Sequence, residues 1–248
     1  MADPRLSIVI PCFNEAENLE PLAAELAAAL DGIDGGYEVL LVDDGSRDDS
    51  PAVMARLAAA DARLRILRQP DNRGQSAAFA VGFRHARGEL IATLDADLQN
   101  DPADLPRMLA EMDDCDVLCG VRTERHDSFV RRVSSRIANG VRNRLTGESI
   151  TDVGCSLRVM RARHARRVPL FDGMHRFLPT LLRLEGARIK EVPVRHRPRL
   201  RGISKYGIHN RLWRALADLF AVRWMQRRWI DPDAAAEVEG ESASERHP

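Results

Sequence analysis

Five short apolar runs alternate with helix-like stretches over the first 121 residues of the chain. The apolar runs lie at 6–10, 37–42, 64–67, 90–94 and 117–119, and the stretches between them at 18–30, 51–60, 75–87 and 102–112. Nearly continuous apolar strands separated by helices predict an α/β fold, with a mostly parallel sheet covered by helices on both faces. Ligands of such sheets bind beyond the carboxyl ends of the strands, so we expect the chemistry just after Ile10, Val42 and Leu94.

The pattern becomes looser beyond residue 121. We expect a basic helix over 129–145, a second helix over 174–184, and an edge strand over 189–194, where Pro193 lacks the donor that a central strand needs. Residues 209–230 have a strong helical pattern. The last segment, 231–248, has few residues to bury, so we expect it to be disordered.

Composition excludes several classes of protein. The 248 residues are 44% hydrophobic with no net charge, which rules out a largely disordered chain and allows a sizeable core. Four scattered cysteines do not form a disulfide scaffold. No run approaches the roughly 18 apolar residues of a membrane-spanning helix. Because the N-terminus also lacks the layout of a secretion signal, we expect a cytoplasmic protein.

Charge is distributed very unevenly along the chain. Residues 1–121 hold 10 basic and 23 acidic residues, whereas residues 122–230 hold 26 basic and 8 acidic ones. A segment so rich in arginine favours an anionic partner, such as phosphates, nucleic acid or an acidic membrane. Nucleic acid is the remote alternative, because aromatic residues do not alternate with the basic ones as a stacking platform requires. We therefore expect no nucleic-acid partner.

Acidic residues follow two of the predicted strands, which we expect to be neighbours: Asp43 and Asp44 come after one, Asp95 and Asp97 after the other. Acids gathered in this way need a positive charge between them. If strand geometry continues, Asp95 and Asp97 face the same side, and Gln99 adds a third oxygen ligand for Mg²⁺ or Mn²⁺. The alternative is that Asp95 or Asp97 caps the following helix. Neither G-x-G-x-x-G nor a P-loop is present.

Several motifs together resemble glycosyltransferase family 2. They are Pro11-x-Phe13-Asn14-Glu15, Val42-Asp43-Asp44-Gly45-Ser46, Asn72-x-Gly74 and Asp95-Ala96-Asp97-x-Gln99. Within the family, the Asp-Ala-Asp-Leu-Gln form and the distal Arg199-x-x-Gly202-x-Ser204-Lys205 resemble the dolichyl-phosphate mannosyltransferases and their bacterial undecaprenyl-phosphate relatives. The segment Thr151–Arg158 departs from the mannosyltransferase pattern and is similar to the aminoarabinose-type bacterial enzymes, which keeps UDP-sugars open as donors. The resemblance covers about residues 5–225.

The resemblance implies a GT-A-type domain over 1–208, followed by an amphipathic helix over 209–230 and the acidic tail over 231–248. It assigns nucleoside contacts to Pro11, Phe13, Glu15, Val42 and Asp44. It assigns the nucleotide and metal loop to Asp95, Ala96, Asp97 and Gln99, with the metal on Asp95, Asp97 and Gln99. It assigns a phosphate contact to Arg122 and closure on the donor to Arg199 and Lys205, and the three would together neutralise the donor and acceptor phosphates. Asp152 is the candidate residue on the acceptor side, with helix capping as its alternative; Asp95, Asp97, Arg122 and Asp152 are the candidate catalytic residues.

The reaction implied is inverting transfer of a sugar from a nucleotide-sugar donor to a polyprenyl phosphate, undecaprenyl or dolichyl. A phosphomonoester has its second pKa near ~6, so the acceptor is largely a dianion at neutral pH and needs no strong general base. The alternative within the family is a soluble glycan or protein acceptor. His175 has no evident partner in the sequence.

The predicted helix over 209–230 is a candidate for contact with a membrane surface. Trp213, Leu216, Phe220 and Trp224 fall on one face, and several arginines flank them. This composition is typical of a helix that lies in a membrane interface, so we expect peripheral association with the inner face of the membrane or with a separate membrane protein. The alternative is an ordinary amphipathic helix packed on the core.

Overall fold

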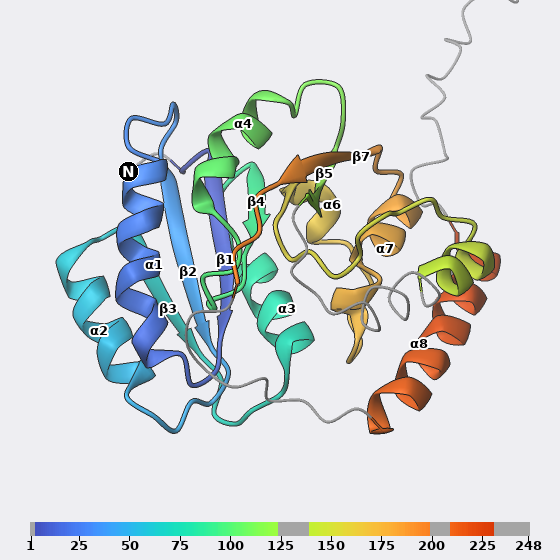
Figure 1. The fold of residues 1–248 in the computed structure, drawn as a ribbon, viewed down its shortest axis with the longest axis horizontal. Coiled ribbons are helices and arrows are strands. Elements are labelled where there is room, and N and C mark those ends of the chain that lie inside the picture. Colours follow the sequence, from blue (N-terminus) through green and yellow to red (C-terminus); the bar gives the residue numbers. More distant parts are fainter. Residues whose placement is uncertain (1–2, 124–138, 199–208, 231–248) are drawn as a thin grey trace, which may run out of the picture.

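The computed structural model describes residues 3–123, 139–198 and 209–230, with the backbone alone for 209–214. Within these ranges seven strands form one sheet in the order β3-β2-β1-β4-β6-β5-β7 (Figure 1). The strands are β1 (Leu6–Cys12), β2 (Tyr37–Asp43), β3 (Leu64–Arg68), β4 (Leu90–Thr93), β5 (Val117–Arg122), β6 (Arg158–Arg161) and β7 (Ile189–Val194). All pairings are parallel except those of β6, which runs antiparallel to both β4 and β5. The predicted mostly parallel α/β sheet is confirmed.

One edge of this sheet collects nearly all the predicted motifs. Because β1, β2, β4, β5 and β7 run in the same direction, their carboxyl ends share this edge, which we call the carboxyl edge. The antiparallel β6 begins there instead of ending there. The segment that precedes β6 is therefore brought to the same edge as the segments that follow the other strands.

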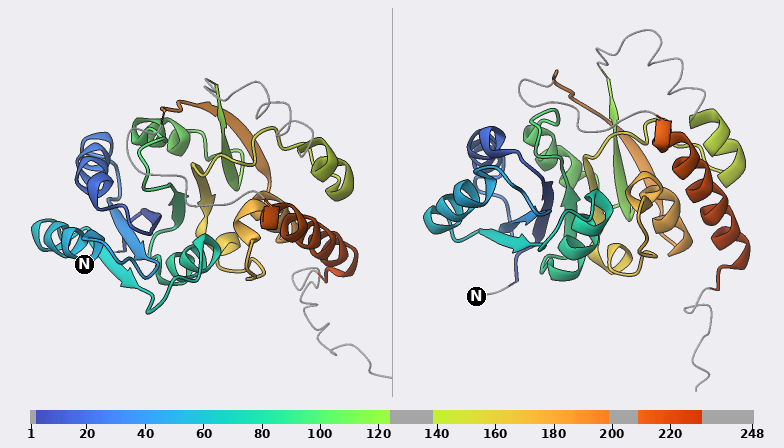
Figure 2. Two further views of the ribbon diagram at one scale, coloured as in Figure 1. Left: turned by 60° about the horizontal axis from the view of Figure 1, so that its bottom comes forward. Right: turned by 90° about the horizontal axis from the view of Figure 1, so that it is seen from below.

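Helices cover both faces of the sheet, as predicted (Figure 2). They are α1 (Ala16–Ala29), α2 (Ser50–Ala60), α3 (Gln75–His85), η1 (Pro102–Asp104), α4 (Leu105–Ala110), α6 (Ala162–Ala165), η2 (Met174–Arg176), α7 (Leu178–Leu184) and α8 (His209–Arg228). Side chains alternate along each strand, so Ile8 and Ile10 join the core under α1, α2 and α4, whereas Val9 joins the core under α3, α7 and α8. Both cores are built from buried side chains.

The less regular second half agrees with the sequence only in part. The edge strand is confirmed, with Pro193 in β7, and the expected helix over 174–184 forms as η2 and α7. Of the basic helix expected over 129–145, residues 139–146 are helical and the rest lies outside the described residues. Strand β6 was missed, because Arg158-Val159-Met160-Arg161 has only two apolar residues. The tail expected to be disordered also lies outside the described residues.

Helix α8 has one face on the core and one face in solvent. Leu219 and Val222 are buried in the core, while Phe220 and Trp224 are 64% and 63% exposed. Gln226 Nε2 donates to the Thr146 carbonyl at 2.8 Å, which ties α8 to the neighbouring helical residues 139–146 (Figures 1 and 2). The packing on the core that was expected as the alternative is therefore present, and the expected contact with a membrane stays a prediction. The side chain of Trp213 lies outside the described residues. Among the described residues, no helix combines the length and the apolar character that crossing a bilayer requires.

Candidate active site

Two of the predicted nucleoside segments lie side by side at the carboxyl edge. The turn after β1 places Asn14 in a left-handed conformation, with φ +53°. The Asn14 N–H donates to Ser46 Oγ at 3.0 Å, and Asn14 Oδ1 accepts the Arg47 N–H at 2.7 Å. The Glu15 N–H donates to Ser50 Oγ at 2.8 Å. These bonds hold the segment containing Pro11, Phe13 and Glu15 against the loop that follows β2.

Asp44 binds the loop that leads into α3. Its Oδ1 accepts Gln69 Nε2 at 2.9 Å and the Arg73 N–H at 2.8 Å, and its Oδ2 accepts the Gly74 N–H at 2.8 Å. Burial raises the pKa of Asp44, although the two backbone hydrogen bonds favour its carboxylate form. Asp44 therefore fixes the Asn72-x-Gly74 motif beside the end of β2.

The acids of the carboxyl edge surround the end of β1. The buried Cys12 thiol has its pKa raised by burial first, and then by the negative charges of Glu15, Asp43 and Asp95. Strands β2 and β4, expected to be neighbours, are not: β1 pairs with both and lies between them. The acids from the two strands thus converge across one intervening strand.

The segment Asp95–Gln99 forms a turn. Strand β4 ends at Thr93 and residues 96–97 are a turn, so the assumption that strand geometry continues through Asp95 and Asp97 is wrong. Leu98 has φ +61°, and the Gln99 N–H donates to Asp97 Oδ1 at 3.1 Å. Asp95 Oδ1 accepts Gln75 Nε2 from the first turn of α3 at 2.8 Å. The helix cap proposed as an alternative role is filled by Asp101, whose Oδ1 accepts the Ala103 N–H at 3.0 Å.

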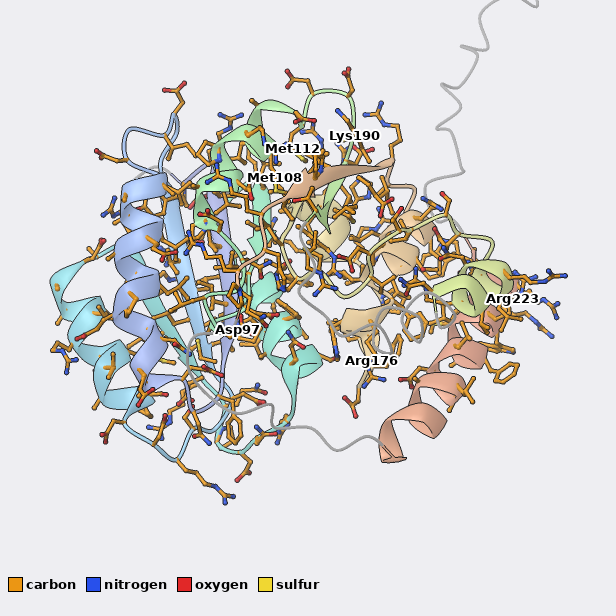
Figure 3. All side chains as sticks on the ribbon, viewed as in Figure 1. Asp97, Met108, Met112, Arg176, Lys190 and Arg223 are labelled. Carbon is orange, nitrogen blue, oxygen red and sulfur yellow. The ribbon has the colours of Figure 1, made fainter. Side chains whose placement is uncertain are left out.

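The side chains of this turn offer oxygen ligands of the kind that Mg²⁺ and Mn²⁺ take. Asp97 is only 7% exposed, and Asp95 and Gln99 are half-buried. Among the described residues, no three His, Cys, Asp or Glu side chains gather closely enough to hold an ion alone. Two carboxylates with one amide suit a cation that also takes oxygens from substrate phosphates, which is the usual binding mode of Mg²⁺. The donor set therefore fits the predicted metal in its chemistry; Figure 3 shows the position of Asp97 in the fold.

Arg122 and Asp152 form a forked ion pair. Arg122 Nε donates to Asp152 Oδ2 at 2.7 Å, and Nη2 donates to Oδ1 at 2.8 Å. The backbone N–H of Arg122 adds a third bond to Oδ2 at 3.2 Å. A Cβ at Gly154 would lie 2.8 Å from Arg122 Nη2, so the glycine permits this close approach. Helix capping by Asp152 is wrong, because residues 153–154 are a turn that leads towards β6.

Two further predicted residues, Val42 and Ala96, lie in the hydrophobic cores and not among the polar side chains of the carboxyl edge. Val42 is fully buried in the core under α3, and Ala96 is buried in the opposite core. Arg199 and Lys205 lie outside the described residues. The roles assigned to the site residues therefore stay predictions.

Two histidines that the sequence did not assign also lie near this region. Ser76 Oγ, in the first turn of α3, contacts His175 Nδ1 at 2.7 Å and accepts the Gly173 N–H at 3.0 Å. His196 Nε2 lies 3.4 Å from Gln99 Nε2. Both contacts join segments almost 100 residues apart, so local sequence patterns carry no signal of them.

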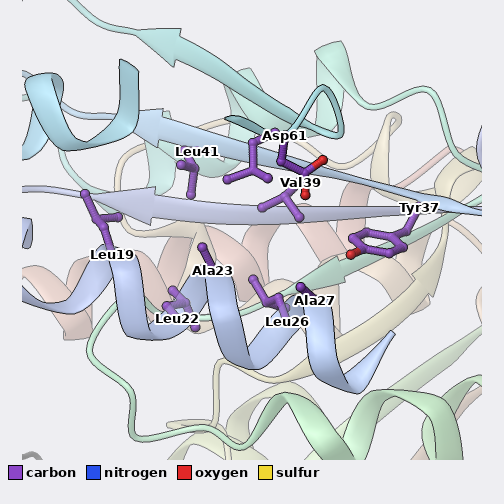
Figure 4. A pocket seen from close by; sticks show the side chains of 10 residues that line it. Leu19, Leu22, Ala23, Leu26, Ala27, Tyr37, Val39, Leu41 and Asp61 are labelled. Atoms are coloured by element: carbon purple, nitrogen blue, oxygen red, sulfur yellow. The ribbon is translucent and has the colours of Figure 1, made fainter. Parts of the chain in front are cut away.

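A small crevice elsewhere is unrelated to these residues. It lies between α1 and β2 and is lined mainly by aliphatic side chains such as Leu19, Leu22 and Leu26 (Figure 4). Its lining includes none of the predicted site residues. We assign it to imperfect packing between helix and sheet.

The comparisons with known proteins place the chain in a family. The model of glycosyl transferase family 2 matches residues 7–168. The chain belongs to glycosyl transferase family 2. The family 2 chain is 42% identical over 229 residues to a dodecaprenyl-phosphate galacturonate synthase of Rhizobium johnstonii, covering 90% of this chain and 67% of the relative. It is 40% identical over 206 residues to an undecaprenyl-phosphate 4-deoxy-4-formamido-L-arabinose transferase of Edwardsiella ictaluri, covering 82% and 63%. This glycosyltransferase chain thus spans about two thirds of the length of these curated relatives.

Solved structures agree on the fold of this family 2 glycosyltransferase. A mannosyltransferase from Pyrobaculum calidifontis, in complex with GDP-Man and Mn²⁺, matches with a TM-score of 0.64 at 21% identity, covering 92% of this chain and 65% of that one. A glucosyl-3-phosphoglycerate synthase from Mycobacterium tuberculosis, in complex with Mn²⁺, UDP and glucosyl-3-phosphoglycerate, matches with a TM-score of 0.65 at 15% identity, covering 93% and 82%. The predicted family and the predicted GT-A-like α/β fold are both confirmed.

Proposed function

We propose that the chain transfers a sugar from a nucleotide-sugar donor to a polyprenyl phosphate, with inversion at the anomeric carbon and with Mg²⁺ or Mn²⁺. The observation that carries this proposal is the identity of 40% or more to two polyprenyl-phosphate sugar synthases or transferases, over 82–90% of the chain. The 21%-identical neighbour that contains GDP-Man and Mn²⁺ agrees with a nucleotide-sugar donor and a divalent cation.

The site residues suit this chemistry. Asp95, Asp97 and Gln99 would hold the divalent cation, which when bound would neutralise the leaving diphosphate. Arg122 has a forked guanidinium suited to phosphate, and Asp152 fixes its direction. The acceptor phosphate is largely dianionic at neutral pH and attacks the anomeric carbon directly, so no side chain has to remove a proton.

The deciding experiment incubates the protein and Mn²⁺ with UDP-sugars and GDP-sugars and with undecaprenyl phosphate, and detects lipid-linked sugar by mass spectrometry. We expect one donor class to give a metal-dependent product. Donor hydrolysis without a lipid product would keep a family 2 enzyme but move the acceptor to a soluble glycan or protein. Absence of product and of hydrolysis with every donor would contradict the proposal.

We further propose that α8 brings this enzyme to an anionic membrane surface, where a polyprenyl phosphate resides. Phe220 and Trp224 project from the outer side of α8, and Arg223, Arg227 and Arg228 lie on the same helix, with Arg223 labelled in Figure 3. Exposed aromatic residues flanked by arginines match the chemistry of an anionic lipid interface. The residue ranges 1–208 and 209–230 then have separate tasks, catalysis and docking.

Replacing Phe220 and Trp224 together by serine should weaken binding to phosphatidylglycerol vesicles by at least about tenfold, because burial of each such side chain is worth about 1.5–3 kcal/mol. Cosedimentation measures the effect. Ile66→Ser is the matched control. Ile66 is also exposed, but it lies on β3, the outermost strand on the side of the sheet far from α8 (Figure 1). Equal binding by the double variant and the wild type would contradict the docking role and favour recruitment by a membrane protein.

A further inference from the structure

Arg197 joins three parts of the molecule that are distant in sequence. Its Nη1 donates to both carboxylate oxygens of Glu25 on α1, at 2.9 Å each, and its Nη2 lies 2.9 Å from Asp101 Oδ1. Glu25 is 172 residues away along the chain. One guanidinium thus bridges α1, the segment after β7 and the start of η1.

The backbone of Arg197 contacts the candidate metal loop directly. Its N–H donates to the Gln99 carbonyl at 2.8 Å, next to an isolated bridge between Asn100 and His196. Its carbonyl accepts Gln99 Nε2 at 3.4 Å, and His196 Nε2 lies at the same distance from that nitrogen. The amide nitrogen of Gln99 is therefore turned towards residues 196–197. These contacts use the nitrogen of the amide and leave its oxygen, the only atom of the amide that binds a cation, for another partner.

We propose that Arg197 is a positioning residue that fixes the amide of Gln99 with its oxygen available to a divalent cation. The inference rests on the proposed function, because it takes Gln99 as a metal ligand. The side chain of Arg197 anchors the segment, and the backbone of the same residue orients Gln99. Outer residues of this kind commonly change metal affinity by about 10–100-fold when they are removed.

Arg195 provides a matched control on the same segment. Its Nη1 pairs with Asp101 Oδ2 at 3.2 Å, but its side chain is 67% exposed and no described contact joins it to α1. Its other contact to this region is the backbone N–H to Asp104 Oδ2 at 2.8 Å, which alanine keeps. Arg195→Ala therefore removes an arginine beside Asp101 and leaves the bridge to α1 intact.

The test measures Mn²⁺ binding by calorimetry in the presence of a saturating nucleoside diphosphate, UDP or GDP, because the side chains of the turn leave coordination positions for phosphate oxygens. Arg197→Ala should raise the Kd for Mn²⁺ by about tenfold, and Arg195→Ala should leave it within about twofold of the wild type. Arg197→Lys should resemble Arg197→Ala, since an ammonium group does not span two carboxylates with the geometry of the guanidinium fork. Circular dichroism and thermal unfolding check that each variant is folded, and Glu25→Gln offers a milder break of the same bridge.

A double-mutant cycle separates positioning from a general structural effect. On the Gln99→Ala background, Arg197→Ala should have no further effect on the Kd, because the amide that it orients is gone. An undiminished effect on that background, or an unchanged Kd in Arg197→Ala, would overturn the inference. A Gln99→Ala protein that binds Mn²⁺ like the wild type would instead contradict the metal role of Gln99 in the proposed function.

Discussion

Asp97→Asn should lower the rate of sugar transfer by about 10²–10³-fold, the range found when one preorganised group that stabilises transition-state charge is removed. Asparagine keeps an oxygen that accepts the Gln99 N–H, as Asp97 Oδ1 does at 3.1 Å, so the turn is preserved. The substitution removes the negative charge of Asp97, a residue that is only 7% exposed. The measurement is the initial rate as a function of Mn²⁺ concentration, and the midpoint should move to higher Mn²⁺.

Asp116→Asn is the control for this experiment. Asp116 is as buried as Asp97 but directly precedes β5, at the edge of the sheet opposite the carboxyl edge. Its Oδ2 accepts the Arg188 N–H at 3.0 Å. We expect this variant to lose some stability and to keep its Mn²⁺ dependence. Wild-type transfer by Asp97→Asn would remove Asp97 from the proposed catalytic set.

Asp152→Ala should reduce the free energy of unfolding by about 3 kcal/mol, because it leaves the Arg122 guanidinium without its forked partner in a largely buried position. The two side chains are 15% and 4% exposed, which places the pair nearer to buried than to surface ion pairs. Urea denaturation measures the loss. The double variant with Arg122→Ala should be less destabilised than the sum of the single variants, since no unpaired charge remains.

The pair Arg63–Asp61 is the matched control for Asp152→Ala. It has the same forked geometry, with Nε to Oδ1 at 2.9 Å and Nη2 to Oδ2 at 2.7 Å. Its side chains are 45% and 28% exposed, so Asp61→Ala should lose only about 0.2–1 kcal/mol from the ion pair. Equal losses of unfolding free energy in Asp152→Ala and Asp61→Ala would show that burial does not increase the contribution of the ion pair to stability.

Features determined by short stretches of chain could be predicted from the sequence. The parallel strands follow from apolar runs, and the place of Asp95–Gln99 just after a strand follows from the same pattern. The turn within Asp95–Gln99 was not predicted, because its shape depends on contacts such as that of Asp95 with Gln75 on α3. Strand β6 could not be predicted, because four residues with an arginine at each end give too weak a period.

Contacts between distant segments were also beyond prediction. Arg122 and Asp152 were each singled out, yet their pairing depends on β6 running antiparallel, a direction that hydrophobic periodicity does not encode. The bridge from Arg197 to Glu25 spans 172 residues and has no local signal at either end.

The position of β6 has a consequence for the order in which the molecule assembles during synthesis. Strands β4 and β5 are consecutive in the sequence, but each pairs with β6 and not with the other. When residues 90–122 have left the ribosome, β6, which joins β4 to β5, has not yet been synthesised. The backbone donors and acceptors on the facing sides of β4 and β5 then have no partners. The step that joins β4 to β5 is therefore the insertion of residues 158–161, and the same step carries Asp152 to Arg122; β7, which follows in the sequence, then pairs with the other side of β5. A nascent chain halted before residue 158 holds the acidic turn and Arg122 on two unjoined parts of the sheet, so the candidate site forms only when the sheet closes.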